Sequence, residues 1–279
     1  GITDVDTGIL MDISHGMAFA SPMKIYAGTY DDITDAAVIV ITAGANQKPD
    51  ETRLDLIRKN SAIMKSIIGE IKKRPFEGIL LIVSNPVDIL TYIALKESGY
   101  PANRVIGSGT VLDTGRFRYE LGEHLEVDSR SIHAFIIGEH GDSELAAWSE
   151  ARVGGMPIHD FCELRGHYDH EASMEKIFNS VKNSAYEIIA RKHATYYGIA
   201  MAVCRICAAI VRNEQSILPV SSLMTGEYGL ENVVLSIPAV VDENGIETVV
   251  PIELNEKELS ELQQSATVLK KVIAEFYPD

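Results

Sequence analysis

Cysteine, basic charge and long apolar stretches are all scarce in this chain of 279 residues. The three cysteines are an odd number, which does not suit a disulfide framework and favours a reducing compartment. Lys and Arg number 25 against 40 Asp and Glu, a formal net charge of −15 that argues against nonspecific nucleic-acid or anionic-membrane binding. No apolar run approaches the roughly 20 residues that span a bilayer, and no signal-peptide pattern opens the sequence. A soluble, cytoplasmic protein is expected.

Two of the cysteines, Cys204 and Cys207, have the spacing of a redox pair or of half a zinc site. They fall inside an apolar helical pattern, away from any turn between a strand and a helix. We identify no second ligand pair for zinc and expect no metal. Both cysteines are interpreted as small apolar residues packed within the helix.

The first part of the chain alternates buried strands with helices. Apolar runs at 36–41 and 79–83 are typical of buried parallel strands, and residues 51–73 between them have helical periodicity. A helix over 88–97 and a short strand with its turn within 101–109 continue the alternation. This pattern predicts an α/β fold with a Rossmann-type, doubly wound parallel sheet, whose ligands bind beyond the carboxyl ends of the strands.

The pattern changes after about Asp142. We expect two long helices, three antiparallel strands and a terminal helix, over 173–193, 195–212, 216–223, 233–241, 249–254 and 255–276. Residues 242–245 form a good hairpin-turn sequence, Asp-Glu-Asn-Gly. A second domain of the α+β class, carrying the substrate site, is therefore expected.

The segment Ile136-Ile137-Gly138-Glu139-His140-Gly141-Asp142 places a single histidine between glycines, directly after a β-branched apolar run. Imidazole can hold or release a proton near neutral pH, and glycine lets a ligand approach closely. Upstream, Asp113 and Arg116 are three residues apart and share one face of a helix. These residues predict proton transfer on an anionic substrate. The structural alternatives are a hydrogen-bonded histidine and an ordinary helix salt bridge.

Further short motifs occur at Ala43-Gly44-Ala45-Asn46-Gln47-Lys48-Pro49, Asn85-Pro86-Val87-Asp88, Gly107-Ser108-Gly109-Thr110 and Ala194-Thr195-Tyr196-Tyr197-Gly198. With them, the chain resembles the bacterial L-lactate dehydrogenases almost from end to end. The resemblance implies NAD as cofactor, lactate and pyruvate as substrates, and a homotetramer with two-fold interfaces. It also implies an NAD-binding domain over residues 1–108 and a substrate domain over 109–279.

The resemblance assigns the roles in catalysis. His140 would exchange the hydroxyl proton of lactate as acid and base, while a hydride passes between the carbon and the nicotinamide. Asp113 would orient the imidazole and stabilise its charged form, and Arg116 would hold the substrate carboxylate by two parallel hydrogen bonds. Arg53 would reach the carbonyl oxygen when a polar lid loop closes. Asp50, where the family usually has glycine, makes the flexibility of that lid a point to test.

Gln47 is expected to select the substrate. Lactate enzymes of the family carry glutamine at this position, and malate enzymes commonly carry arginine to pair a second carboxylate. Thr195 would line the substrate pocket, whose edge includes His193 where relatives often have glycine. The nearest alternative is a dehydrogenase of malate or another 2-hydroxy acid. From a different class, a scaffold of the same fold without catalysis is the alternative.

The cofactor is expected to lie against Gly44, Asn85 and Ser108, with Asn85 also contacting the substrate. A dinucleotide fold should open with a strand and a Gly-x-Gly-x-x-Gly turn, and this sequence contains neither. By resemblance, Asp6 would end the second strand and bind the adenosine ribose. The segments around it are shorter than in the family, so a break in the chain is expected at 4/5, at 7/8 or at both.

Arg118 follows Arg116 by two residues and should point from a different face of the helix. In bacterial relatives the matching arginine, with a histidine that matches His133, forms a site for fructose bisphosphate across a subunit interface. The resemblance therefore implies allosteric activation, in which the ligand binds the active assembly preferentially. The structural alternative is a surface arginine and a packed histidine.

Overall fold

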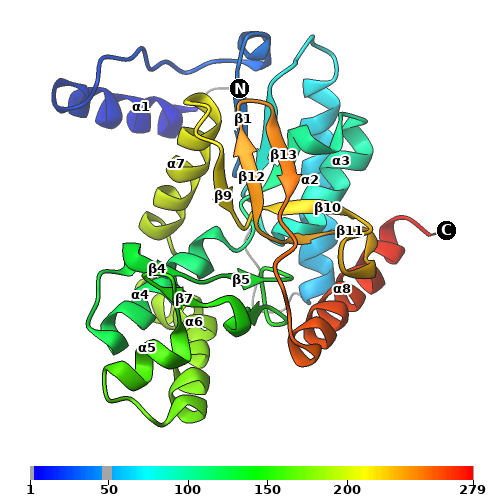
Figure 1. Ribbon diagram of the computed structural model, residues 1–279. Helices are drawn as coiled ribbons and strands as arrows, with labels where there is room; N and C mark the ends of the chain where they lie inside the picture. The colour runs from blue at the N-terminus through cyan, green and yellow to red at the C-terminus, as the bar shows by residue number, and fades with distance from the viewer. Residues whose placement is uncertain (1–2, 46–51, 279) are drawn as a thin grey trace.

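A computed structural model describes residues 3–45 and 52–278, apart from the side chains of Val5 and Arg53. At its centre is a five-stranded sheet with the order β1-β2-β3-β10-β11 (Figure 1). The strands are β1 (Val38–Ile41), β2 (Ile79–Ile82), β3 (Val105–Gly107), β10 (Ser221–Thr225) and β11 (Glu231–Ser236). The first three are parallel to one another, as expected, whereas β10 pairs antiparallel with both β3 and β11.

Both faces of this sheet are covered. On one face lie α2 (Arg53–Ile71), α3 (Val87–Ser98) and α8 (Glu256–Phe276), with Leu80 and Ile82 of β2 in the shared core. On the other face Ile79 and Leu81 pack against α7 (Tyr197–Val211) and a small sheet of β9 (Ser216–Leu218), β12 (Ala239–Asp242) and β13 (Gly245–Val249). Because successive side chains of a strand point to opposite faces, a strand covered on both sides must be apolar throughout.

A second lobe carries its own core below the sheet in Figure 1. Its helices are α4 (Val111–Leu125), α5 (Ile158–Leu164) and α6 (His170–Lys192). Its short strands are β4 (Ile132–His133), β5 (Ile136–Ile137), β6 (Leu145–Ala146), β7 (Arg152–Val153) and β8 (Met156–Pro157). Phe117 is fully buried at its centre and meets Trp148 edge to face, with ring centroids 4.8 Å apart. Three-residue turns of 3₁₀ helix link elements of this lobe at Ser129–Ser131 and Trp148–Glu150, and elements of the central sheet at Ala102–Arg104 and Glu227–Gly229.

The later strands differ in detail from the expectation. The predicted strands at 216–223 and 233–241 are each divided in two, because within each segment the chain crosses between the small sheet and the central one. The Asp242–Gly245 turn is confirmed, with Gly245 at φ 100°, but its second strand is β13 rather than 249–254. Pro251 lies in that stretch, and it has no backbone N–H to donate to a ladder.

The beginning of the chain overturns one prediction. Residues expected to end a strand instead form the helix α1 (Asp4–Gly16), in which the Asp6 side chain and Thr3 make a capping box. The helix runs continuously through positions 4/5 and 7/8, and the Thr7 N–H donates to the Thr3 carbonyl at 3.1 Å. The expected breaks are therefore absent. None of the described side chains of α1 is buried, and 3₁₀ turns at Met17–Phe19 and Tyr30–Ile33 lead towards β1.

The helix expected around the paired cysteines is confirmed, but the packing of Cys204 is not. Cys204 is exposed on α7 and Cys207 is half-buried. Cys204 falls on the outer side of a helix whose inner side carries Ile206 and Ala209 in the core. Among the described residues, no helix combines the length and apolar character needed to cross a membrane.

Candidate active site

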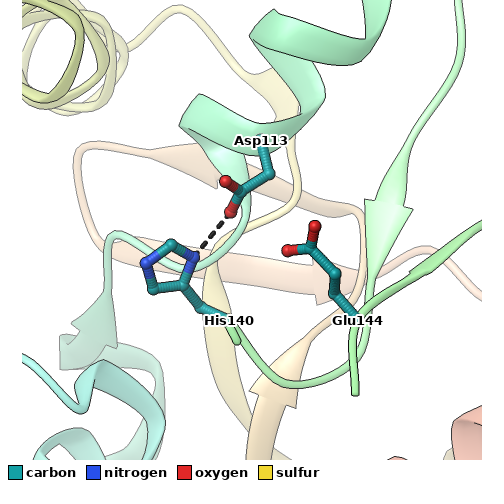
Figure 2. A group of neighbouring side chains, drawn as sticks. All are labelled: Asp113, His140 and Glu144. Atoms are coloured by element: carbon teal, nitrogen blue, oxygen red, sulfur yellow. Dashed lines mark hydrogen bonds and ion pairs between the residues drawn. The ribbon is translucent and has the colours of Figure 1, made fainter. Parts of the chain in front are cut away.

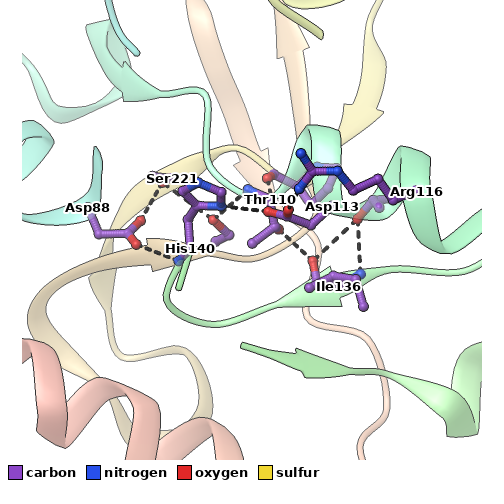
Figure 3. A network of polar contacts seen from close by, with 10 residues as sticks. Asp88, Thr110, Asp113, Arg116, Ile136, His140 and Ser221 are labelled. Carbon is purple, nitrogen blue, oxygen red and sulfur yellow. Dashed lines mark hydrogen bonds and ion pairs between the residues drawn. The ribbon is translucent and has the colours of Figure 1, made fainter. Parts of the chain in front are cut away.

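His140 lies just after β5, where the two lobes meet. Its Nδ1 is 2.6 Å from Oδ2 of Asp113 on α4, and the other carboxylate oxygen accepts a 2.8 Å hydrogen bond from Nη1 of Arg116 (Figure 3). Only 4 % of the Asp113 side chain is exposed, compared with 28 % for His140. The structure thus brings together the three residues that the sequence predicted to act on an anion. The buried carboxylate holds a ring on one side and a guanidinium on the other.

The backbone of His140 is fixed by a residue that the sequence analysis did not select. Asp88, buried at the start of α3, accepts a hydrogen bond from the His140 N–H at 2.7 Å and another from the Ser221 hydroxyl at 2.5 Å. Burial raises the pKa of Asp88 to about 6, although both hydrogen bonds oppose the shift. The signal was present as the last residue of the Asn85–Asp88 motif, but no local pattern relates that position to residue 140.

Two threonines join the helix of Asp113 to the strand of His140. The Thr110 hydroxyl donates to the Ile136 carbonyl at 2.5 Å, and the Thr114 hydroxyl accepts from the Ile136 N–H at 2.9 Å. Both threonines are buried. These contacts hold the imidazole and its carboxylate partner in one arrangement without using either functional group.

Glu144 is a second carboxyl group beside the pair (Figure 2). One ligand-capable atom from each of Glu144, Asp113 and His140 lies within 4.8 Å of the other two, and Glu144 is buried. Burial, together with the negative charge of Asp113, raises the pKa of Glu144 to about 8. Near neutral pH the group therefore holds a proton. No sequence pattern predicts this role, because an acid that follows a glycine-rich loop resembles an ordinary solvated residue.

The charge of His140 follows from its partners. Burial alone lowers the pKa of His140, but the charge and hydrogen bond of Asp113 outweigh it and raise the pKa to about 9. Burial raises the pKa of Asp113, but the charges and hydrogen bonds of His140 and Arg116 outweigh burial, so that the pKa lies below its ordinary value. At neutral pH the pair is an imidazolium and a carboxylate. The site can therefore donate a proton from Nε2.

A cavity of about 460 Å³, lined in part by His140, opens at the carboxyl ends of β1, β2 and β3. Its lining includes six of the predicted site residues: Gly44, Asn85, Ser108, Arg116, His140 and Thr195. Asn60 of α2 lines it too and joins two of its loops. The Asn60 amide accepts from the Ala45 N–H at 2.8 Å and donates to the Asn85 carbonyl at 2.9 Å. A polar residue on the buried face of α2 was the available signal for this role.

The cavity suits the nicotinamide end of a dinucleotide. It occupies the crevice at the strand ends where doubly wound sheets bind such ligands, and Asn85 is exposed to it. At Gly44 an added Cβ would meet Asn60 at an ordinary 3.5 Å, so packing inside the protein does not by itself demand glycine. The phosphate end has no counterpart in the sequence, which contains no Gly-x-Gly-x-x-Gly turn.

The other residues predicted for the site lie outside the strand-end cavity or outside the described part of the chain. Gln47 and Asp50 lie outside the described residues, as does the side chain of Arg53 at the start of α2. The Asp6 carboxylate accepts from Thr3 in α1, so its expected position at a strand end is wrong. His193 ends α6 at φ 68°, the left-handed conformation that explains why glycine suits the position.

Of the two residues expected to bind fructose bisphosphate, Arg118 is on α4 and His133 is in β4, and the two do not line one cavity. The Arg118 guanidinium donates to the Ala134 carbonyl at 3.1 Å and lies 5.2 Å from the Phe135 ring centroid. Arg118 lines a hollow against α7 that does not include His133, which is exposed. Arg118 does point away from the cavity of Arg116, as its position on the helix predicted.

A doubly wound sheet with a buried His–Asp pair and an arginine at its strand ends defines an oxidoreductase that uses a nucleotide cofactor on a small anion. The chain belongs to the lactate/malate dehydrogenase family: residues 2–107 match its NAD binding domain and residues 110–277 its alpha/beta C-terminal domain. Its cofactor is NAD. The relationship and the fold class expected from the sequence are thereby confirmed.

Curated relatives and solved structures agree with this assignment. The chain is 54 % identical to an L-lactate dehydrogenase of Acetivibrio thermocellus over 95 % of this chain and 84 % of the relative. It is 51 % identical to L-lactate dehydrogenase 1 of Clostridium acetobutylicum, over 96 % and 86 %. The ligand-bound crystal structure of the minor L-lactate dehydrogenase from Enterococcus mundtii superimposes with a TM-score of 0.94 at 46 % identity, covering 98 % of this chain and 87 % of that one.

Proposed function

We propose that this protein interconverts L-lactate and pyruvate, with His140 as the acid and base. The single observation that carries the proposal is the His140–Asp113–Arg116 arrangement at the mouth of the strand-end cavity. When bound, NAD supplies the acceptor or donor of the hydride. The names of the relatives, all L-lactate dehydrogenases, support the choice of substrate.

In this mechanism Arg116 binds the substrate carboxylate with the guanidinium atoms that do not face Asp113. The substrate oxygen then lies against Nε2 of His140. In the reducing direction Nε2 gives its proton to that oxygen, and in the oxidising direction it takes the hydroxyl proton. Asp113 keeps the proton of the second ring nitrogen directed at itself and stabilises the imidazolium. Arg53 is proposed to polarise the carbonyl after closure of the loop before α2.

The remaining contacts complete the binding site. Asn85, Thr195, Gly44 and Ser108 border one cavity, and we assign Asn85 and Thr195 to the substrate, with Asn85, Gly44 and Ser108 against the nicotinamide half of the cofactor. Gln47 is proposed to exclude a second carboxylate, because its neutral amide offers no cation to pair it. The ribose contact proposed for Asp6 has no support from its place in α1. The scarce, free cysteines support a cytoplasmic location.

The test compares NADH oxidation with pyruvate and with oxaloacetate, in wild type and in His140→Asn. We expect a preference for pyruvate and a loss of roughly 10²–10⁴-fold in kcat for the variant, the contribution typical of general acid–base catalysis. A preference for oxaloacetate would overturn the choice of substrate. Absence of NADH binding, measured by fluorescence, would instead favour a scaffold without catalysis.

We also propose that fructose bisphosphate activates a homotetramer through Arg118 and His133. Arg118 donates to the carbonyl of Ala134, the residue after His133. The His133 side chain is exposed, so it can meet an anion at the surface. The large apolar side chains exposed on α7, Tyr197 at 78 %, Met201 at 75 % and Val211 at 68 %, support self-association.

The activator is tested by adding fructose bisphosphate to wild type and to His133→Gln. We expect a lower KM for pyruvate and a larger sedimentation coefficient with the wild type, and at least a tenfold weaker response with the variant. His15→Gln, a change of an exposed histidine on α1, is the matched control. An equal response of both variants and wild type would exclude His133 from the site.

A further inference from the structure

Four of the eight histidines of this chain line one small hollow in the second lobe. They are His124 at the end of α4, His159 in α5, His167 in the following loop and His170 at the start of α6. Cys162 of α5 lines the same hollow. The residues from His159 to His170 form the pattern His-x₂-Cys-x₄-His-x₂-His, whose short spacings are those of transition-metal ligands.

The rings are already arranged in two close pairs. The centroids of His124 and His167 are 4.4 Å apart, and those of His159 and His170 are 5.0 Å apart. Two imidazoles on one tetrahedral zinc ion, with Zn–N bonds of about 2.0–2.1 Å, place their centroids about 5 Å apart. The loop between the pairs is tied to the cysteine, because the His167 N–H donates to the Cys162 carbonyl at 2.9 Å.

One nitrogen in the hollow has no partner. Nε2 of His124 is buried and makes no hydrogen bond within the part of the chain that the structure describes. A buried polar atom without a partner is destabilising, and a bound metal ion would satisfy this nitrogen.

The hollow is about 20 Å³, which is room for one water-sized species. We propose that it is a binding site for one borderline divalent cation of the zinc type, held by Cys162, His124, His167 and one ring of the second pair. The donor atoms are not yet gathered as closely as those of Asp113, His140 and Glu144, so the rings rotate on binding. His170 then leaves its 3.5 Å contact with Glu163 if it is the fourth ligand.

Such a site would join α4, α5 and α6 and is separate from the strand-end cavity. None of its five residues lines that cavity. The expected role is structural, because a closed set of protein ligands leaves no open position for a substrate. The prediction of no metal rested on the Cys204–Cys207 pair, whereas these ligands combine histidines with a single cysteine.

The test uses the full chain after treatment with EDTA, titrated with Zn²⁺ by calorimetry and with Co²⁺ by absorption. We expect one ion per chain, a rise in Tm with Zn²⁺, and a thiolate-to-Co²⁺ charge-transfer band that Cys162→Ser abolishes. His167→Asn should weaken Zn²⁺ binding at least tenfold. Cys207→Ser, which changes a half-buried cysteine on another helix, is the matched control and should bind as wild type.

Two controls separate loss of the site from loss of the fold and from binding elsewhere in the protein. Circular dichroism and pyruvate reduction without metal establish that Cys162→Ser and His167→Asn are folded, and Glu144→Gln tests the carboxylates beside His140. Absence of saturable Zn²⁺ binding by the wild type overturns the site. Binding that persists in both Cys162→Ser and His167→Asn, or that disappears in Glu144→Gln, also overturns it, because the ion then lies elsewhere.

Discussion

Asp88 and His140 are 52 positions apart in the chain, and the backbone N–H of His140 donates to the Asp88 carboxylate at 2.7 Å. Through this contact the helix that follows the Asn85 loop of the strand-end cavity sets the position of the loop that carries His140. The same carboxylate accepts from Ser221 of β10, so three segments of the chain meet at one buried group. His140, the proposed acid and base, is therefore positioned through its backbone as well as through its ring.

Replacing Asp88 tests this placement. Asp88→Ala leaves the Ser221 hydroxyl and the His140 N–H without their acceptor, and we expect a loss of about 2–4 kcal/mol in the free energy of unfolding. Asp88→Asn can still accept from the His140 N–H while its amide donates to Ser221. Urea unfolding at pH 7 should therefore rank the variants Asn above Ala. Equal losses would contradict the hydrogen-bonding account.

The raised pKa of Asp88, about 6, also predicts a pH dependence. Because the folded value exceeds the unfolded one, protonation favours the folded state, and this contribution is present at low pH and lost as pH rises through about 6. The stability of wild type relative to Asp88→Asn should accordingly increase from pH 7 to pH 4. Urea denaturation across this range is the measurement, and a constant difference would be the contrary result.

The pKa of His140, about 9, sets the pH profile of the reaction. Reduction of pyruvate needs the imidazolium, so its kcat/KM should fall as pH rises through about 9, while oxidation of lactate should rise over the same range. Asp113→Asn removes the charge that supports the imidazolium. Its profile should shift to lower pH, which stopped-flow or steady-state rates with both substrates would show, and an unshifted profile would exclude this role of Asp113.

Glu144 should affect the rate of pyruvate reduction only at alkaline pH. It holds a proton below about 8, so Glu144→Gln should change pyruvate reduction little at pH 7. Above pH 8 the ionised wild-type group adds a negative charge beside His140 and preserves the imidazolium, and the variant should lose activity at a lower pH. Asp142→Asn, an exposed carboxylate two residues away, is the control. A large loss already at pH 7 would contradict protonation of Glu144.

His193 provides a test of backbone conformation. With φ at 68°, this residue ends α6 in a region that glycine adopts without cost. His193→Gly should raise the free energy of unfolding by up to about 1 kcal/mol, less the entropy that glycine loses on folding. His193→Ala keeps the conformational cost and should not stabilise. Thermal unfolding of the two variants separates the backbone effect from loss of the imidazole.

Helices and strands were predicted best where a single local signal, such as a continuous apolar run or a helix cap, determines the element. β2 is apolar at every position because it is covered on both faces, and the terminal helix begins at the Asn255 capping box as expected. The start of the chain was predicted wrongly, because similarity to a strand was given more weight than the local Thr3–Asp6 cap. The His140–Asp113–Arg116 group was found through motifs. Asp88, Asn60 and Glu144 were missed, because their roles depend on tertiary contacts between distant segments.

The pairing of β3 with β10 has a consequence for how the molecule can be divided. These strands come from opposite sides of residue 108, yet their backbones share the central sheet. After a proteolytic cut between residues 107 and 110, separation of the two fragments would expose β3 as an unpaired edge on one fragment and β10 on the other. The fragments should stay associated after cleavage, and separately expressed halves should regain structure only by complementation.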